Sequence, residues 1–353
     1  MKNKMTMMLL IIFSVIVLVI LGCILFKYLV TNRVMDRGGM ERSTSQSEEN
    51  MTAVAENESG KKSERLQETT SVEAERSKDG STGTISDLQT PAIGTYRSTV
   101  TVSTIEECLS SIANDTRIIL KAGTYDLSET KQYDNRNPYL RADVWGDICD
   151  YTIVGVSNLS IEAQEGAEVS VVTQHAGAPV LRLEYCSNIN LDGLVCGHDV
   201  NPGSCTGSVI AAYRTNTLAV NNCWLYGCGT YGIDADQCTG LSADNTEIYD
   251  CSEGILLLND TWIANFSGCR FYQNEGFNMF RMIDSYDITF TNTEIYENQI
   301  GLEHEPLIDV ENSENVVFKE CEFRDNMVEP SAEEYPDVFF ENCNVVDSDG
   351  GTE

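Results

Sequence analysis

The stretch that decides the fold is 218–226, Leu-Ala-Val-Asn-Asn-Cys-Trp-Leu-Tyr, because the chain repeats its pattern. The next copy is 241–249, Leu-Ser-Ala-Asp-Asn-Thr-Glu-Ile-Tyr, and the one after it is 264–272, Ala-Asn-Phe-Ser-Gly-Cys-Arg-Phe-Tyr. Apolar and polar residues alternate inside each copy, which is the period of a β-strand. Further copies cover 189–194, 288–296, 316–323 and 338–343.

One position of the repeat holds a small or apolar residue in every copy. Its successive spacings are 29, 23, 23, 24, 28 and 22 residues. Strand alternation inside a period of about 23 residues predicts a solenoid with three short strands in each coil. Successive coils would stack about 4.8 Å apart, so every repeated position becomes a ladder. This ladder consists of Leu194, Cys223, Thr246, Cys269, Thr293, Cys321 and Cys343.

A short helix is predicted ahead of the repeat. Thr104 and Glu107 have the spacing of a capping box at a helix N-terminus. Apolar residues follow at the helical positions 105, 108, 109 and 112. We therefore expect one amphipathic helix that covers the open end of the solenoid core.

These features resemble the right-handed parallel β-helix proteins of the pectin lyase-like superfamily, over about residues 95–346. The resemblance implies an all-β domain of three-strand coils with a short N-terminal capping helix. For activity it implies little, because the superfamily includes lyases, hydrolases, epimerases, adhesins and inert scaffolds. In this superfamily asparagine ladders satisfy the backbone groups of turns. The column that fits such a ladder here is Cys228, Cys251, Asn274, Asn298 and Asn326.

The charge of the chain is strongly negative and unevenly distributed. Of the formal net charge of -32, residues 93–353 account for -31, with 12 basic and 43 acidic side chains. A surface this acidic repels polyphosphates and anionic lipid headgroups, so nucleic acid is excluded as a partner. A hydrophobic content of 42% is enough for a packed core.

The N-terminal residues predict that the rest of the chain is located outside the cytoplasm. Residues 7–26 form an uncharged, mainly apolar run of 20 residues, long enough to cross a bilayer. We expect residues 1–30 to be a short tail and a transmembrane signal-anchor. Lipidation at Cys23, or cleavage of a signal peptide, are the alternatives. Residues 31–92 lack aromatic residues and predict a disordered tether, which leaves 93–353 as the β-helix domain on the extracytoplasmic side.

One outward face of the predicted solenoid gathers polar side chains. Alternation places Asp234 and Asp236 outward on one strand, with Tyr213 and Asn259 one coil away on either side. Two carboxylates could bind Ca²⁺ or supply a general acid and base. The alternative is that they only solubilise the sheet face. Two cations, Arg182 and Arg281, are predicted to lie two coils off on either side, about 10 Å from the pair.

The segment 231–236, Tyr-Gly-Ile-Asp-Ala-Asp, is similar to the Tyr-Gly-Phe-Asp-Pro-His segment of the alginate C5-epimerases. Tyr231 and Asp234 match that motif residue for residue, and Asp236 stands where the family has its catalytic His. The resemblance implies catalytic roles for Tyr231, Asp234 and Asp236.

Aromatic residues supply two further expectations. The loop 128–150, which contains Trp145, either forms a lip that stacks on a sugar or packs over the helix side. A tyrosine recurs after each shared segment at the coil period, so Tyr226, Tyr249, Tyr272 and Tyr296 are expected to form one aromatic ladder. The sequence thus favours a membrane-tethered β-helix that binds a polysaccharide. It leaves open whether the protein also modifies this polysaccharide, as a lyase, epimerase or hydrolase. The alternative is a non-catalytic surface scaffold or adhesin, and no cofactor other than Ca²⁺ is implied.

Overall fold

The computed structural model describes residues 95–346, except 131–136, 146–147, 202–203, 228, 301–305, 329, 331–334 and 336. The predicted signal-anchor and tether lie outside the described residues, as do Cys228 and the side chain of Trp145. None of the helices in the described part of the chain is long and apolar enough to cross a membrane.

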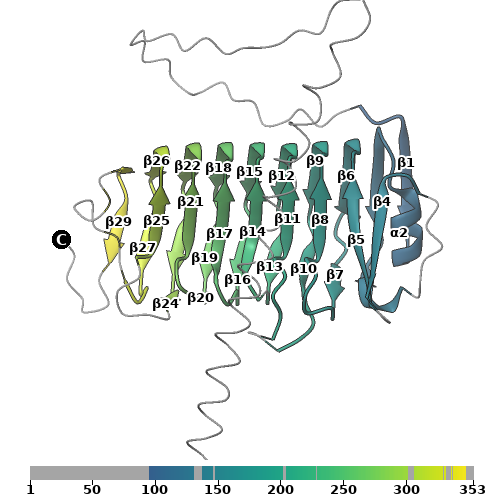
Figure 1. The fold of residues 1–353 in the computed structure, drawn as a ribbon, viewed down its shortest axis with the longest axis horizontal. Helices are drawn as coiled ribbons and strands as arrows, with labels where there is room; N and C mark the ends of the chain where they lie inside the picture. The colour runs from purple at the N-terminus through teal and green to yellow at the C-terminus, as the bar shows by residue number, and fades with distance from the viewer. Residues whose placement is uncertain are drawn as a thin grey trace, which may run out of the picture. The chain divides into compact units, whose positions relative to one another are not determined.

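Three long β-sheets make up the domain, and their strands stack along one axis (Figure 1). The ten-strand sheet is ordered β1 (Ser98–Val102), β2 (Thr116–Leu120), β6 (Ser157–Ala163), β9 (Ser187–Asp192), β12 (Asn216–Asn221), β15 (Thr239–Asp244), β18 (Trp262–Ser267), β22 (Tyr286–Thr291), β26 (Glu314–Lys319) and β28 (Val338–Glu341). The nine-strand sheet is ordered β3 (Gly123–Asp126), β7 (Val169–Thr173), β10 (Val195–His198), β13 (Trp224–Tyr226), β16 (Glu247–Tyr249), β19 (Arg270–Tyr272), β23 (Glu294–Tyr296), β27 (Glu322–Arg324) and β29 (Asn344–Val346). The eight-strand sheet is ordered β4 (Leu140–Trp145), β5 (Ile148–Val154), β8 (Leu181–Glu184), β11 (Ile210–Tyr213), β14 (Tyr231–Asp236), β17 (Gly254–Asn259), β21 (Phe280–Ile283) and β25 (Ile308–Glu311).

Each complete coil contributes one strand to each sheet, as the repeat predicts. A representative coil runs β14, β15 and β16, and each of these strands pairs in parallel with its counterpart in the next coil. Two short strands, β20 (Glu275–Gly276) and β24 (Gln299–Ile300), form a separate parallel pair. The three-strand coil is therefore confirmed.

The segment 128–150 differs from the expected loop. It contains the end of a 3-10 helix, η1 (Leu127–Glu129), and the strand β4, which pairs with β5 as an antiparallel hairpin. The prediction of a loop here was wrong because the segment Leu-Arg-Ala-Asp-Val-Trp lies outside the 23-residue repeat that revealed the other strands. The stack also begins well before the first copy of the repeat at 189, since β1 already pairs in parallel with β2.

The interior is filled by the inward residues of all three sheets. On β14 and β17 the inward residues Ile233, Ala235, Leu256 and Leu258 are fully buried, as the alternation predicts. Aromatic rings stack from coil to coil in the C-terminal half, at 4.8 Å between Phe266 and Phe290 and 4.3 Å between Phe290 and Phe318. These rings give the core its continuity across β18, β22 and β26.

Ladders of small polar residues hold the turns. The amide of Asn274 donates to the side-chain oxygen of Asn298 at 3.0 Å, and that of Asn298 donates to Asn326 at 2.9 Å. The asparagine ladder is thus confirmed for these three coils, where it satisfies buried turn groups. In the other predicted column, Cys223, Cys269 and Cys321 are free, buried thiols that contact backbone carbonyls of the preceding coil.

The capping helix is α2 (Ile105–Ser111), which lies at the N-terminal end of the stack (Figure 1). The hydroxyl of Thr104 accepts a hydrogen bond from the backbone N–H of Glu107 at 3.2 Å. The Glu107 carboxylate accepts one from the N–H of Ser103 at 2.7 Å. Residues 105, 108 and 109 are buried against the core, so the predicted cap is confirmed.

The predicted tyrosine ladder runs along the outer face of the nine-strand sheet. The ring centroids of Tyr226, Tyr249, Tyr272 and Tyr296 are 5.7, 5.2 and 5.1 Å apart, and the rings are nearly parallel. The guanidinium of Arg324 covers the last ring, 3.8 Å from its centroid. A glycine at 197 makes room for the first ring, since a Cβ there would lie 2.4 Å from Tyr226.

Candidate functional site

Two columns of outward side chains cross the eight-strand sheet, in the register that the alternation predicts. The first pairs Arg182 with Ala211, Ala211 with Asp234, and continues through residue 257 to Arg281. The second column is Glu184, Tyr213, Asp236, Asn259, Ile283 and Glu311.

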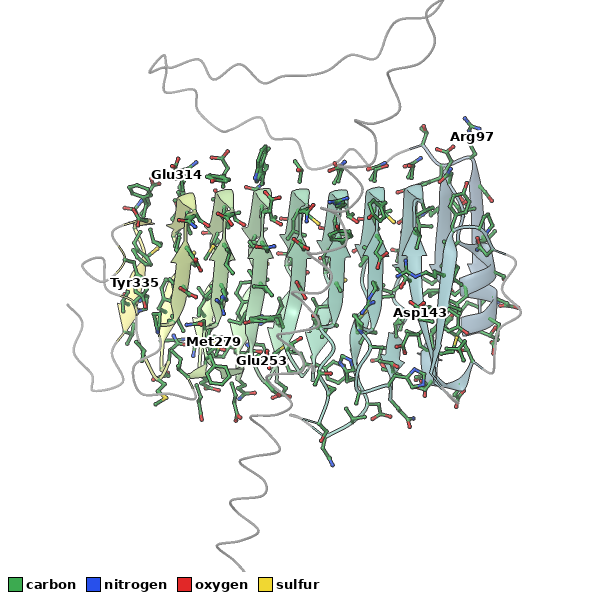
Figure 2. All side chains as sticks on the ribbon, in the orientation of Figure 1. Arg97, Asp143, Glu253, Met279, Glu314 and Tyr335 are labelled. Atoms are coloured by element: carbon green, nitrogen blue, oxygen red, sulfur yellow. The ribbon has the colours of Figure 1, made fainter. Side chains whose placement is uncertain are left out.

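A pocket of about 460 Å³ opens on this face, over β8, β11, β14 and β17. Its floor lies at Ala211, whose side chain ends at Cβ and leaves a recess between the longer side chains of Arg182 and Asp234. The turns that precede the four strands form one wall, and Figure 2 labels Glu253 in the turn before β17. The lining residues that carry polar side-chain groups are Arg182, Glu184, Thr206, Ser208, Tyr213, Thr230, Tyr231, Asp234, Asp236 and Glu253.

Asp234 is a half-buried carboxyl group of the pocket. Burial raises its pKa above the ordinary value, and the neighbouring charge of Asp236 raises it further. The hydroxyl of Ser208 donates to Oδ2 of Asp234 at 3.3 Å and, together with the charge of Arg182, opposes that shift. The net shift of the pKa of Asp234 is upward, which is the direction that a general acid needs.

Asp236 lies two residues further along β14 and on the same face. Its Oδ1 accepts a hydrogen bond from the side-chain amide of Asn259 at 2.7 Å. This contact fixes the orientation of the carboxylate, which also lines the pocket. Asp234 and Asp236 therefore present two carboxyl groups in different environments, as acid–base chemistry requires.

Tyr231 and Glu253 occupy the wall of the pocket. The Tyr231 side chain is buried, and this burial raises its pKa, so the phenol is held as a hydrogen-bond donor. Burial also raises the pKa of Glu253. Arg281 lies beside the Tyr231 hydroxyl and pairs with Asp309 at 3.4 Å, so it belongs to the surroundings of the pocket and not to its lining.

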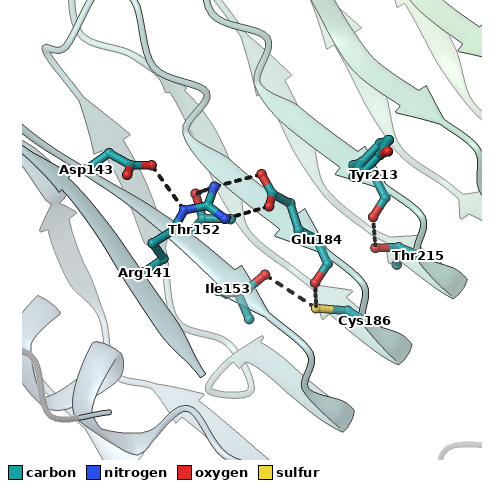
Figure 3. Close-up of polar contacts among 8 residues, drawn as sticks. All are labelled: Arg141, Asp143, Thr152, Ile153, Glu184, Cys186, Tyr213 and Thr215. Carbon is teal, nitrogen blue, oxygen red and sulfur yellow. Dashed lines mark hydrogen bonds and ion pairs between the residues drawn. The ribbon is translucent and has the colours of Figure 1, made fainter. Parts of the chain in front are cut away.

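The N-terminal rim of the pocket is held by an ion-pair network, shown in Figure 3. Arg141 of β4 binds Glu184 through two hydrogen bonds, of 2.7 and 2.9 Å, and contacts Asp143 at 3.2 Å. The hydrogen bonds from Arg141 hold the pKa of Glu184 below its usual value. Because this carboxylate is already neutralised by Arg141, it is not free to hold a substrate cation.

Arg182 is the cation that lines the pocket, and it differs from Arg141 in having no hydrogen bond or ion pair within the part of the chain that the structure describes. Its charge acts on both Asp234 and Glu184. An unpaired guanidinium in a pocket can bind a ligand hydroxyl or carboxylate in a fixed planar geometry.

The fit of Ca²⁺ to the two aspartates is poor. Among the described residues there is no group of three or more His, Cys, Asp or Glu side chains that could hold a metal ion. Ca²⁺ takes six to eight oxygen ligands, and one carboxylate here is buried with a raised pKa.

The structure brings together Arg182, Tyr213, Tyr231, Asp234 and Asp236 at one pocket. It places Asn259 next to Asp236 on the adjacent strand, and Arg281 beside Tyr231. The side chain of Trp145 lies outside the described residues. Sequence reasoning missed the wall residues Thr206, Ser208, Thr230 and Glu253. The signal that could have found them is that three of these positions, 208, 230 and 253, stand at the coil period of about 23 residues.

Comparison with known proteins bears on the fold. A family model described as a right handed beta helix region matches residues 198–352. This match agrees with the expected right-handed parallel β-helix, which the three stacked parallel sheets show. No curated protein matches the chain.

Several solved structures are similar at low sequence identity. A pectin methylesterase in complex with a hexasaccharide is 10% identical, with 74% of this chain and 92% of that chain covered and a TM-score of 0.40. A polygalacturonase from Erwinia carotovora ssp. carotovora is 10% identical, with 75% and 100% covered and a TM-score of 0.36. A pectate lyase is 13% identical, with 64% and 60% covered and a TM-score of 0.39. At these values none of the likenesses bears on substrate or mechanism.

Proposed function

We propose that the pocket on the eight-strand sheet binds a polysaccharide chain and cleaves one of its glycosidic bonds. The observation that carries this proposal is the presence of two carboxyl groups in one pocket, of which Asp234 has a pKa raised by burial. A right-handed β-helix is also a fold typical of proteins that act on or bind polysaccharides. An elongated chain suits a lateral face built of stacked strands.

In the proposed reaction, Asp234 donates its proton to the oxygen of the leaving sugar as the C–O glycosidic bond breaks. Asp236 accepts a proton from the water that forms the new C–O bond at the sugar carbon. The two carboxyl groups thereby exchange protonation states, and no oxidant, reductant or cofactor is consumed. Tyr231, held as a phenol, and Arg182 orient the sugar ring by hydrogen bonds to its substituents.

The test is turnover by the full-length protein on a panel of galacturonan, alginate, xylan and chitin. Asp234→Asn and Asp236→Asn should each lower the rate about 100- to 10,000-fold, which is the usual contribution of general acid–base catalysis. Glu294→Gln, on the outer face of the nine-strand sheet, is the matched control and should leave the rate unchanged. A new reducing end together with a saturated non-reducing end supports hydrolysis, whereas an unsaturated non-reducing end would indicate a lyase and an epimerised, uncleaved chain an epimerase.

A non-catalytic scaffold or adhesin is the second candidate. The hydrogen bond between Asn259 and Asp236 favours it, because similar pairs join neighbouring coils elsewhere on the surface. Asn222 donates to Asp192 at 2.8 Å, and Asn315 donates to Asp287 at 2.5 Å. If all panel members bind without turnover, this second function holds.

We also propose that the chain is anchored in the cell membrane with the β-helix on the extracytoplasmic side. The support is the run of 20 uncharged residues at 7–26 and the aromatic-free segment 31–92 that follows it. Membrane fractionation should recover the full chain with the membranes, and deletion of residues 1–30 should release it. Protease added to intact cells should trim the protein to a core that starts near residue 93. Protection of the whole chain from that protease would contradict the orientation.

A further inference from the structure

We propose that Tyr185, together with Tyr213 and Arg214, forms a subsite that stacks on a pyranose ring of the bound polysaccharide. This inference rests on the proposed polysaccharide-binding function of the pocket and extends the binding surface beyond it. The subsite lies past the C-terminal ends of β8 and β11, where the chain turns into the ten-strand sheet.

The aromatic pair is continuous with the pocket. Tyr213 lines the pocket and stands next to Asp236 in the register of β11 and β14. The ring of Tyr185 meets the ring of Tyr213 edge to face, at 5.5 Å between centroids and 84° between planes. The backbone N–H of Tyr185 donates to the carbonyl of Tyr213 at 2.9 Å, which fixes the relative position of the two residues.

An arginine completes the platform. The guanidinium carbon of Arg214 lies 5.0 Å from the Tyr213 centroid and 5.8 Å from the Tyr185 centroid. Its Nε donates to the side-chain oxygen of Gln237 at 2.8 Å, which orients the guanidinium over the rings. A sugar that stacks on these rings would therefore meet an oriented donor for its hydroxyl or carboxylate oxygens.

Tyr185 has a backbone conformation that is unusual for its residue type. Its φ is +56°, in the left-handed region that bulky side chains rarely adopt. The equivalent turn residue has a positive φ in the other described coils as well. Arg214 and Gln237, in the next two coils, are also long side chains, whereas Gly155, Asp260, Asp284 and Asn312 are of types that tolerate this region better. The Tyr185 side chain is also 52% exposed, so it contributes little to the core.

An exposed tyrosine beside a pocket has the properties of a sugar-binding residue, because its ring offers an apolar face at a low cost in conformational entropy. A second exposed aromatic pair provides a comparison within the same molecule. Trp262 is 51% exposed and meets Tyr286 edge to face at 6.0 Å, but neither residue lines the pocket. The two pairs therefore differ in their distance from the pocket while sharing exposure and geometry.

The experiment uses the full-length protein and measures affinity for galacturonan, mannuronan and xylan oligosaccharides, each as a disaccharide and as a hexasaccharide. Tyr185→Asn removes the ring and introduces a residue suited to the left-handed turn, so the domain should keep its thermal stability. It should weaken hexasaccharide binding about three- to tenfold and leave disaccharide binding unchanged, because one stacked ring is lost outside the pocket. Tyr185→Phe, which keeps the ring, and Trp262→Ala, which lies elsewhere, should both bind like the wild type.

Three results would overturn the subsite. If Tyr185→Asn binds the hexasaccharide as tightly as the wild type, the ring does not contact the chain, while the Asp234 and Asp236 turnover assay still stands on its own. If binding of both lengths weakens equally, Tyr185 acts on the pocket itself and not on a neighbouring subsite. If the wild-type protein binds none of the oligosaccharides, the subsite fails together with the proposed function.

Discussion

The outer faces of the nine-strand and eight-strand sheets share one coil spacing but use it differently. On the nine-strand sheet a single residue type recurs, and four tyrosines stack at 5.1 to 5.7 Å. On the eight-strand sheet the residue changes at every coil, from Arg182 through Ala211 to Asp234 and beyond. The first face forms a continuous ladder, and the second contains a pocket of about 460 Å³.

The difference shows how a stacked fold separates structure from chemistry. On the nine-strand sheet, the stacked tyrosine rings cover one another. The charged side chains beside them are paired as well. The phenol of Tyr272 donates to Oε2 of Glu247 at 2.9 Å, and Arg270 binds the same carboxylate. On the eight-strand sheet, dissimilar neighbours leave a recess lined by Arg182 and Asp234. Burial raises the pKa of Asp234 there. The repeated column of the nine-strand sheet thus forms a ladder, whereas the varied columns of the eight-strand sheet line a pocket.

The largest effect is expected for a core residue of the nine-strand sheet, on the side opposite the tyrosine ladder. Ile248 is fully buried beneath the tyrosine ladder. We expect Ile248→Ala to lower the free energy of unfolding by about 2–5 kcal/mol, because it opens a cavity in the core. Chemical denaturation of the wild type and the variant measures this difference.

Loss of one ring from the ladder should have a smaller effect. Tyr249 stacks on Tyr226 and Tyr272, at 5.7 and 5.2 Å. With each ring contact worth roughly 0.5–1.5 kcal/mol, Tyr249→Ala should lower the unfolding free energy by about 1–3 kcal/mol. Tyr249→Phe keeps both contacts and should be close to the wild type. A Tyr249→Ala cost above that of Ile248→Ala would mean that the ladder, and not the core beneath it, carries the stability of these coils.

Filling the recess should make the outer face of the eight-strand sheet continuous, like the outer face of the nine-strand sheet. Ala211→Leu adds a side chain between Arg182 and Asp234, where the pocket lies. We expect it to weaken oligosaccharide binding at least about tenfold while changing stability by only about 0.5 kcal/mol. Thr289→Leu, on the outer face of the ten-strand sheet, is the control. Undiminished binding by Ala211→Leu would show that the recess is not where the ligand lies.

The smallest effect is expected in how the stability of the folded protein depends on pH through Asp234. The pKa of Asp234 is raised in the folded protein, so the folded state binds this proton more tightly than the unfolded chain. The stability that this proton gives is present at low pH and is lost as the pH rises through the folded pKa. The variant Asp234→Asn has no proton to lose at this position. The difference between its melting temperature and that of the wild type should therefore increase, in favour of the variant, from acid to neutral pH. A difference that is constant across this range would contradict a raised pKa.

The sequence predicted most of the fold because burial imposes a regular pattern on it. Every second residue along a strand points inward and is apolar, as Ile233 and Leu256 are. The pattern also repeats with each coil, about every 23 residues. The columns of the pocket face followed from the same alternation, which is why Asp234, Asp236 and Tyr213 could be grouped in advance. Repetition across several coils made the prediction robust to local exceptions.

The features that sequence reasoning missed lie where no such pattern applies. The antiparallel hairpin of β4 and β5 occurs once, so no second copy revealed it. The contribution of Ser208 and Glu253 to the pocket depends on the path of the turns, which hydrophobic alternation does not specify. The pKa of Asp234 depends on how deeply the finished pocket buries it, which is a property of the assembled coils.

The recess at Ala211 has a consequence for how such a protein can acquire a new activity. A solenoid lengthens by duplication of a coil, and a new copy begins with the same residue as its neighbour at every position. Shortening one outward side chain to Ala, and exchanging the next for Asp, requires few substitutions at positions where most changes hardly affect stability.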